Sequence, residues 1–357
     1  MLDRFPPEIC AHIFNFACRD SGYTGRSLSC VSRYISQTSK SARYMSIELR
    51  GRAQILAFAQ LLEQAPTQLG TRYLFINGQE SEAEMEKIVQ FAYTGCREAQ
   101  AEKSKLAKLL SPGDEKLKEA EDGLARQKAK GRLYLETFGR EGANAVESIL
   151  RNLAPTLEVL DISLNEYVAK MMLHTISLPY LMDLTTRCCF PLHPSDVPIL
   201  EPTHSLRHLH VVEITDQWTW TQEFFRNGIS YFAPSLTHLR LSQLEQDETV
   251  TDLEAALGLS VPDHRVTQLP STIELVLIKP AVAPPPHVGC SCCDETVIYH
   301  DLVKSARQLR DRDHRVVLLQ ADGTSPAEDP YLQEWIDKVG GAACYWDTSR
   351  LDMAASD

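Results

Sequence analysis

The chain has 357 residues, of which 43% are hydrophobic and 24% charged, proportions typical of a globular protein with a buried core. Its net charge of -12 disfavours nucleic acid as a partner, because binding to phosphates requires clustered Lys and Arg. No segment approaches the roughly 18 uncharged apolar residues that span a bilayer, and no apolar run of a secretory signal follows the N-terminus. We therefore expect an intracellular protein, in the cytoplasm, the nucleus or both, whose ten cysteines remain thiols.

Residues 1–50 have the pattern of three short helices followed by a strand. A helical stripe begins behind Pro6 and Pro7, where the first turn of a helix tolerates missing amide donors. The stripe consists of Ile9, Cys10, Ile13, Phe14 and Ala17. A loop of turn-forming residues is expected at 19–25, further helices at 28–31 and 32–38, and a half-buried strand at 45–49, where apolar and polar residues alternate.

Residues 51–96 predict the first strand and helix units of a larger domain. Helical spacing at 52–64, a strand pattern at 73–76 and a capping box formed by Ser81 and Glu84 support this prediction. Residues 97–132 differ in composition, being rich in Lys, Glu and Ala and interrupted by Gly123 and Gly131. We expect a charged, exposed and flexible insertion there, either a solvated helix or a disordered loop.

Residues 133–345 contain one short phrase that recurs five times. The copies begin at Pro155, Pro179, His204, Pro234 and Pro270, and each follows the pattern L-x-x-L-x-L or a near variant. This is the strand phrase of leucine-rich repeats, whose units must stack to bury their apolar face. The intervals between copies are uneven, and only the first copy continues to an asparagine, Asn165. The repeats are therefore irregular.

The predicted fold is α/β, with an N-terminal three-helix module followed by an irregular leucine-rich-repeat solenoid. Strands at 73–76 and 316–319 are expected to add further units, which makes six or seven strands. A final helix at 330–338 is expected to cap the open end of the array, because an uncapped last strand would expose its edge. A tail occupies residues 346–357.

The start of the chain resembles the F-box, whose pattern is L-P-x-E-I, then I-F, then V-C/S-K/R. The matching residues here are Phe5-Pro6-Pro7-Glu8-Ile9, Ile13-Phe14 and Val31-Ser32-Arg33. A helical module of this kind followed by leucine-rich repeats is a familiar layout of that family, and the chain looks most similar to the F-box proteins of mushroom-forming fungi. Phe5 stands where leucine is usual, and Tyr34-Ile35 where many members have tryptophan.

The resemblance implies a substrate adaptor of an SCF-type ubiquitin ligase that performs no catalysis and needs no cofactor. Its partners would be a Skp-type adaptor with its cullin complex, and a protein substrate that the sequence does not identify. The expected docking face is Phe5, Pro6, Pro7, Ile9, Ile13, Phe14 and Val31. An alternative is a leucine-rich-repeat scaffold with a helical cap and no ubiquitin-ligase role, because solenoids routinely carry such caps.

The residues expected to bind a substrate alternate with the buried leucines of the repeat strands. In leucine-rich solenoids such side chains line the concave surface, which selects Asp161, Thr185, His210 and Arg240. Their mixed charges indicate polar recognition.

Metal sites and enzyme sites are not favoured by the sequence. Cys290, Cys292 and Cys293, with His287 and His300 nearby, have ligand chemistry but lack the second distant pair of structural zinc sites, so we expect a loop with incidental thiols. His208 and His210 have no evident acidic or cysteine partner nearby in sequence, and we expect surface histidines. No phosphate loop, zinc helix or nucleophile elbow is present.

Overall fold

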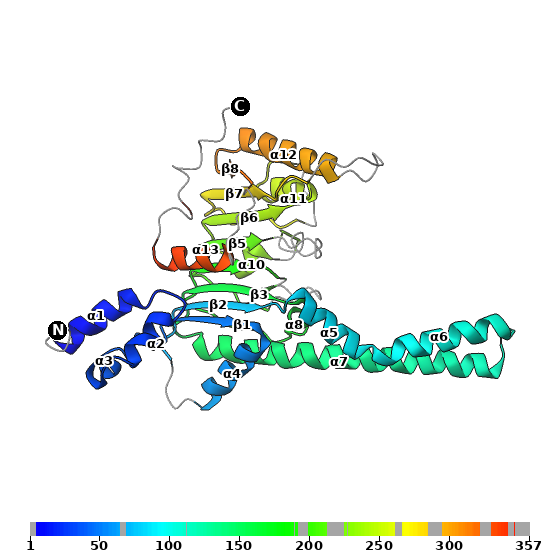
Figure 1. Ribbon diagram of the computed structural model, residues 1–357. Coiled ribbons are helices and arrows are strands. Elements are labelled where there is room, and N and C mark those ends of the chain that lie inside the picture. Colours follow the sequence, from blue (N-terminus) through cyan, green and yellow to red (C-terminus); the bar gives the residue numbers. More distant parts are fainter. Residues whose placement is uncertain are drawn as a thin grey trace.

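An eight-stranded parallel sheet forms the centre of the mixed α/β fold (Figure 1). The computed structural model describes residues 5–64, 69–111, 113–188, 190–191, 199–212, 225–226, 228–260, 266–284, 295–321, 330–341 and 346. The strands are β1 (Ser46–Arg50), β2 (Tyr73–Gly78), β3 (Val159–Leu164), β4 (Asp183–Thr186), β5 (His208–Val212), β6 (His238–Leu244), β7 (Leu275–Pro280) and β8 (Val316–Leu318). They lie side by side in chain order.

The recurring phrase correctly predicts the strands and the register of β3 to β6, but in β7 the row continues through Val276, so the copy that begins at Pro270 is one residue out of register. Leu160 of β3 pairs with Leu184 of β4, which pairs with Leu209 of β5, and the same row continues through Leu239 of β6. These leucines are fully buried on one face of the sheet. The expected count of six or seven strands was too low, because the strand of the N-terminal region, β1, pairs with β2 and extends the same sheet.

The helices that connect the strands cover one face of the sheet. Parallel neighbours in chain order require each connection to return over the sheet, and here the returning segments share one core with the leucine rows. The helices in this layer are α4 (Gly51–Gln64), α7 (Glu115–Leu153), α8 (Glu166–Ala169), α10 (Ile229–Phe232), α11 (Glu248–Ala256) and α12 (Glu295–Arg312). The opposite face of the sheet is therefore left for other contacts.

Asn165, the single asparagine that continues a repeat phrase, links two neighbouring units. Its side-chain oxygen accepts a hydrogen bond from the Val168 amide at 3.0 Å and so caps α8. Its amide nitrogen donates to the Gly78 carbonyl at the end of β2, at 3.3 Å. The side chain thus ties the end of β3 to the end of β2.

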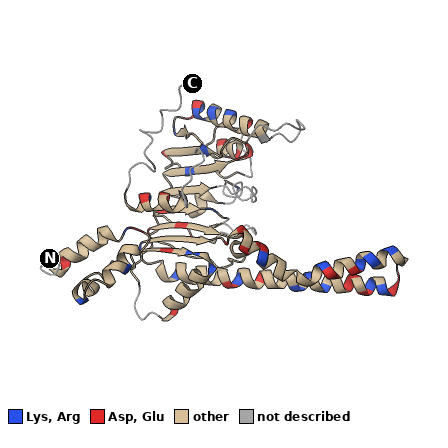
Figure 2. Cartoon of the chain, viewed as in Figure 1, with Lys and Arg blue, Asp and Glu red and all other residues tan. Residues whose placement is uncertain are grey.

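The charged insertion forms a helical hairpin that projects from the sheet (Figures 1 and 2). Helix α5 (Glu82–Ala92) leads into α6 (Thr94–Leu109), which packs along α7. Lys, Arg, Asp and Glu are interspersed along both helices of the hairpin (Figure 2). The boundary expected at residue 132 falls inside α7, since a helix of 39 residues continues from the hairpin into the core. Gly131 does not break it, because it makes room for the ring of Tyr93.

Three helices form the N-terminal module, as expected: α1 (Pro7–Ala17), α2 (Tyr23–Ser29) and α3 (Arg33–Thr38). Helix α2 begins inside the expected loop because the Asp20 carboxylate accepts hydrogen bonds from the amides of Gly22 and Thr24, each at 2.9 Å. Among the described residues, no helix combines the length and apolar character needed to cross a membrane.

The final helix, α13 (Pro330–Val339), does not cap the edge of β8, which corrects the expectation from sequence. It lies on the face of the sheet opposite α4, α7, α8, α10, α11 and α12 (Figure 1). Its Trp335 is fully buried and belongs to a second core with Phe75 of β2 and Phe14 of α1. The last helix therefore joins the N-terminal module to the sheet.

Candidate functional site

Helix α1 carries two apolar faces, of which only one is buried within the chain. Cys10, Phe14 and Cys18 point into the second core. The other face is exposed, with Phe5 46%, Ile9 48%, Ile13 42% and Phe16 58% accessible to solvent. Ile9, Ile13 and Phe16 are spaced i, i+4 and i+7 and lie along one line of the helix, and Phe5 lies just before its first turn. We call this set the α1 stripe.

The structure exposes most of the expected docking face and removes one member. Pro6, Pro7 and Val31 are exposed, the last in the turn between α2 and α3. Phe14 is only 2% exposed, so its expected role in docking is wrong and its role is to hold α1 against the rest of the protein. Phe16 belongs to the stripe but was not selected from the sequence, although its spacing from Ile9 and Ile13 was a sufficient signal.

Local contacts fix the orientation of α1. Pro6 occupies the N-cap and its carbonyl accepts the Ile9 and Cys10 amides, each at 3.1 Å. The Tyr34 hydroxyl of α3 donates to the Phe5 carbonyl at 2.6 Å. Tyr34, which stands where the resemblance predicts tryptophan, therefore anchors the beginning of the stripe.

The four expected substrate residues form one row across the outer face of the sheet. Asp161 pairs in register with Thr185, Thr185 with His210, and His210 with Arg240. Each alternates with the buried leucines, as the repeat pattern predicts. We call these four residues the polar ladder.

Helix α13 covers the polar ladder. The Lys338 ammonium donates to the Thr185 hydroxyl and to the Asp183 carboxylate, both at 2.7 Å. Glu334 forms an ion pair with Arg240 at 3.1 Å. The four ladder residues are consequently buried, so the expectation that they are open to solvent is wrong, because a distant segment of the same chain lies on them.

Two aromatic contacts complete the cover. The Arg187 guanidinium lies 4.2 Å from the centre of the Tyr331 ring and forms an ion pair with Asp161. The Trp335 ring lies 5.6 Å from the Phe75 ring. The cover therefore combines charged contacts over β3 to β6 with an aromatic anchor over β2.

The histidines of the ladder region are held by the sheet itself. His210 is buried, which corrects the expectation of a surface position, and a ring nitrogen lies 2.8 Å from the Ser242 hydroxyl. Burial, together with the nearby Arg240, holds the pKa of His210 well below its usual value. His208 lies 3.5 Å from Asp183, an acidic partner that the sequence did not indicate.

Asp183 is the most connected acidic group of this face. Burial acts to raise its pKa, but Lys338 and His208 outweigh burial, and the pKa is lowered overall. The Trp346 indole nitrogen also donates to the Asp183 carboxylate at 3.3 Å, and the indole stacks on His208. Asp183 is therefore an ionised anchor for the C-terminal segment.

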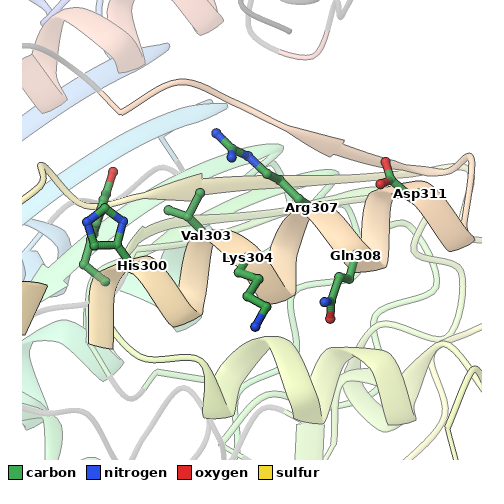
Figure 3. Close-up of a pocket in the computed structure, with 7 residues that line it drawn as sticks. His300, Val303, Lys304, Arg307, Gln308 and Asp311 are labelled. Atoms are coloured by element: carbon green, nitrogen blue, oxygen red, sulfur yellow. The ribbon is translucent and has the colours of Figure 1, made fainter. Parts of the chain in front are cut away.

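No metal centre is found among the described residues. The sequence positions His287, Cys290, Cys292 and Cys293 lie outside the described residues, and only His300 of that group is placed, on α12. His300 lines a hollow with Lys304, Arg307, Gln308 and Asp311 (Figure 3). All described residues that line this hollow come from α12, so within the described part of the chain no second element supplies a polar group that converges on a ligand.

Comparison of the chain with models of known protein families, with curated proteins and with solved structures finds no match. The α1 stripe and the polar ladder therefore carry the functional argument by themselves.

Proposed function

We propose that this protein is the substrate-recognition adaptor of an SCF-type ubiquitin ligase. In this proposal the N-terminal helices are an F-box-like module that binds a Skp-type adaptor attached to a cullin. The strand and helix units are an irregular leucine-rich-repeat solenoid that binds a protein substrate. In this proposal the chain performs no catalytic step, and its partners transfer the ubiquitin.

The α1 stripe is the observation that carries the proposal. Three large apolar side chains lie exposed along one line of a helix whose other apolar face is already buried, and Phe5 lies exposed just before this helix. Fully burying a side chain of this size contributes roughly 1.5–3 kcal/mol. Each side chain of the stripe is about half exposed, so a partner that covers it gains about half of this free energy per side chain. Contiguous exposed apolar side chains of this kind mark protein interaction sites.

The position of the stripe also suits an adaptor. Phe14 and Cys10 face the core shared with β2, whereas Ile9 and Ile13 face away from it. A partner on the stripe therefore does not contact the sheet or the outer face on which α13 lies. One chain can in this way hold a ligase component and a substrate at the same time.

Co-expression with a Skp-type adaptor tests the proposal. We expect the two proteins to co-purify, and we expect Ile9→Glu to abolish co-purification because it places a charge in the middle of the stripe. Asn15→Glu is the matched control, since Asn15 is exposed on the same helix but lies on a different face. Phe16→Glu should act like Ile9→Glu.

The outcomes are separable from loss of folding. Ile9→Glu and Phe16→Glu both change exposed residues, so the melting temperatures of these variants should match that of the wild type within a few degrees. Failure of the wild type to co-purify, or capture that Ile9→Glu leaves unchanged, would sink the adaptor role. The alternative, a leucine-rich-repeat interaction scaffold with a helical cap, would then remain.

A further inference from the structure

Helix α13 meets the sheet through one face only. Tyr331, Glu334, Trp335 and Lys338 contact the sheet, and their spacing of i, i+3, i+4 and i+7 puts them on one side of the helix. Tyr331 lies over Arg187, just after β4, and Lys338 lies over Asp183, where β4 begins. The helix therefore runs antiparallel to β4.

The surface beneath α13 is polar over β3 to β6, whereas over β2 it is the apolar core that holds Trp335. The side chains of Lys338 and Asp183 are each only 7% exposed. Buried ion pairs are often replaced by apolar groups without loss of stability, so stability alone gives little reason for this pair. Charged pairs do give selectivity, because a helix without the matching charge would leave a buried group unpaired.

The strand side chains keep partners when α13 is taken away. Asp161 remains paired with Arg187, and Asp183 remains beside His208. His210 and Arg240 each retain a contact with the Ser242 hydroxyl. Without α13 the ladder would be a polar surface open to water, on which Arg240 exchanges its ion pair with Glu334 for hydration, so neither arrangement leaves a charge buried without a polar contact.

A helix that replaces α13 must supply an aromatic side chain at the position of Trp335. Trp335 fills a core between Phe75 and the N-terminal helices, and this core would open if the indole left without a substitute. Within the described part of the chain, the buried Trp335 indole nitrogen has no hydrogen-bond partner. The site therefore recognises the indole by its apolar ring.

We propose that the outer face of β2 to β6 is a binding site for a helix of a partner protein, and that α13 is its internal occupant. The partner helix presents an aromatic ring, a carboxylate, a second large aromatic ring and an ammonium at i, i+3, i+4 and i+7. It competes with α13 for Arg187, Arg240, Phe75 and Asp183. That this partner is a ubiquitination substrate rests on the proposed function; the binding site does not.

A peptide with the sequence of residues 330–341 serves as the probe. It carries a fluorophore and a hydrocarbon staple between positions 333 and 337, because Gln333 and Asp337 are exposed and contact each other at 2.8 Å. The full chain with Lys338→Glu has its own helix repelled from Asp183. We expect this variant to bind the peptide at least tenfold more tightly than the wild-type chain does, as measured by fluorescence anisotropy.

Charge reversal separates recognition from unfolding. The Lys338→Glu chain should reject a peptide that carries the same Lys338→Glu change. The chain with both Lys338→Glu and Asp183→Lys restores an ion pair of reversed polarity, so it should regain the wild-type melting temperature and exclude the probe. Lys304→Glu, on the exposed side of α12, is the matched control and should behave as the wild type.

Three results would overturn the inference. One is equal affinity of the Lys338→Glu chain for the two peptides. Another is no binding of the probe by a Lys338→Glu chain whose circular dichroism matches that of the wild type. A third is a Lys338→Glu dimer in size-exclusion chromatography that exchanges its helices, which would make a second copy the occupant. Loss of Skp-type adaptor capture with retained peptide binding would count against the proposed function alone.

Discussion

Replacing Trp335 by alanine tests whether the last helix holds the N-terminal module against the sheet. The indole is fully buried, contacts the Phe75 ring at a tilted angle and shares a core with Phe14. Truncating a buried Trp to Ala lowers the free energy of unfolding by about 3–5 kcal/mol, of which an aromatic pair accounts for about 0.5–1.5 kcal/mol. We expect a loss of this size in urea-induced unfolding.

Trp335→Phe separates the ring from the indole nitrogen. The phenyl ring keeps most of the contact with Phe75, and the change also removes a buried N–H group that has no partner among the described residues. An unpaired buried donor costs about 1–3 kcal/mol, so its removal offsets lost packing, and we expect a net loss below about 1.5 kcal/mol.

Hydrogen exchange provides the second measurement for Trp335→Ala. Amides of α1 and α3 should exchange faster in this variant, since Phe14 and Ile35 lose a neighbour in their shared core. A loss of stability below about 1 kcal/mol, with unchanged exchange in α1, would refute the reasoning, because a buried Trp that holds two parts together cannot be removed at so small a cost.

Three further predictions follow from buried charges and close contacts. Arg187→Ala should lower the free energy of unfolding by about 3–5 kcal/mol, because it removes the ion-pair partner of the buried Asp161 carboxylate. A double-mutant cycle with Asp161→Ala should give a coupling energy above about 1 kcal/mol. Additive losses of stability in the two single variants would contradict this coupling. Because His210 stays neutral when folded but is protonated near pH 6.5 when unfolded, the free energy of unfolding should fall as the pH drops below about 7, by at most about 1.4 kcal/mol per pH unit. His210→Gln should flatten this slope in urea titrations at pH 5–7, and an unchanged slope would exclude His210 as its source. In α7, Gly139→Ala should lower the melting temperature because its Cβ would lie 2.2 Å from a backbone carbonyl of α8, whereas Gly123→Ala meets open space and should stabilise the helix by about 0.5–1 kcal/mol; equal effects in thermal unfolding would contradict the close contact.

The strands were predictable from the sequence because their signal is local. Most repeat phrases place two apolar residues two positions apart, as in Leu160 and Ile162, and this spacing alone puts them on one face of a strand. The register follows as well, since Leu160, Leu184 and Leu209 occupy equivalent positions and stack in one row. The ladder residues were placed correctly in their row for the same reason.

The cover over the ladder was not predictable, because its contacts join distant parts of the chain. Lys338 reaches Asp183 across 155 residues, and nothing in the sequence near either residue indicates the other. The helix itself was correctly predicted from Leu332, Trp335 and Ile336. Its docking position depends on Phe75 and the N-terminal helices, which share with it a core that only the folded chain forms.

The course of α7 was misjudged because glycine has two meanings in a helix. Glycine lowers helix propensity, and on this ground Gly123 and Gly131 suggested breaks. In the structure Gly131 lies against Tyr93 and Gly139 against the α8 backbone, so these positions need the absence of a side chain. The helix is maintained by packing that outweighs the local preference.

The contact between Trp335 and the N-terminal core has a consequence for how the protein is made. Phe14 emerges from the ribosome early, but the core to which it belongs lacks its largest side chain until residue 335 has been synthesised. During that interval the inner face of α1 lacks the cover that α13 supplies. A chain whose synthesis stops before α13 would therefore leave part of this core open in addition to the α1 stripe, which makes it a substrate for chaperones and prone to aggregation.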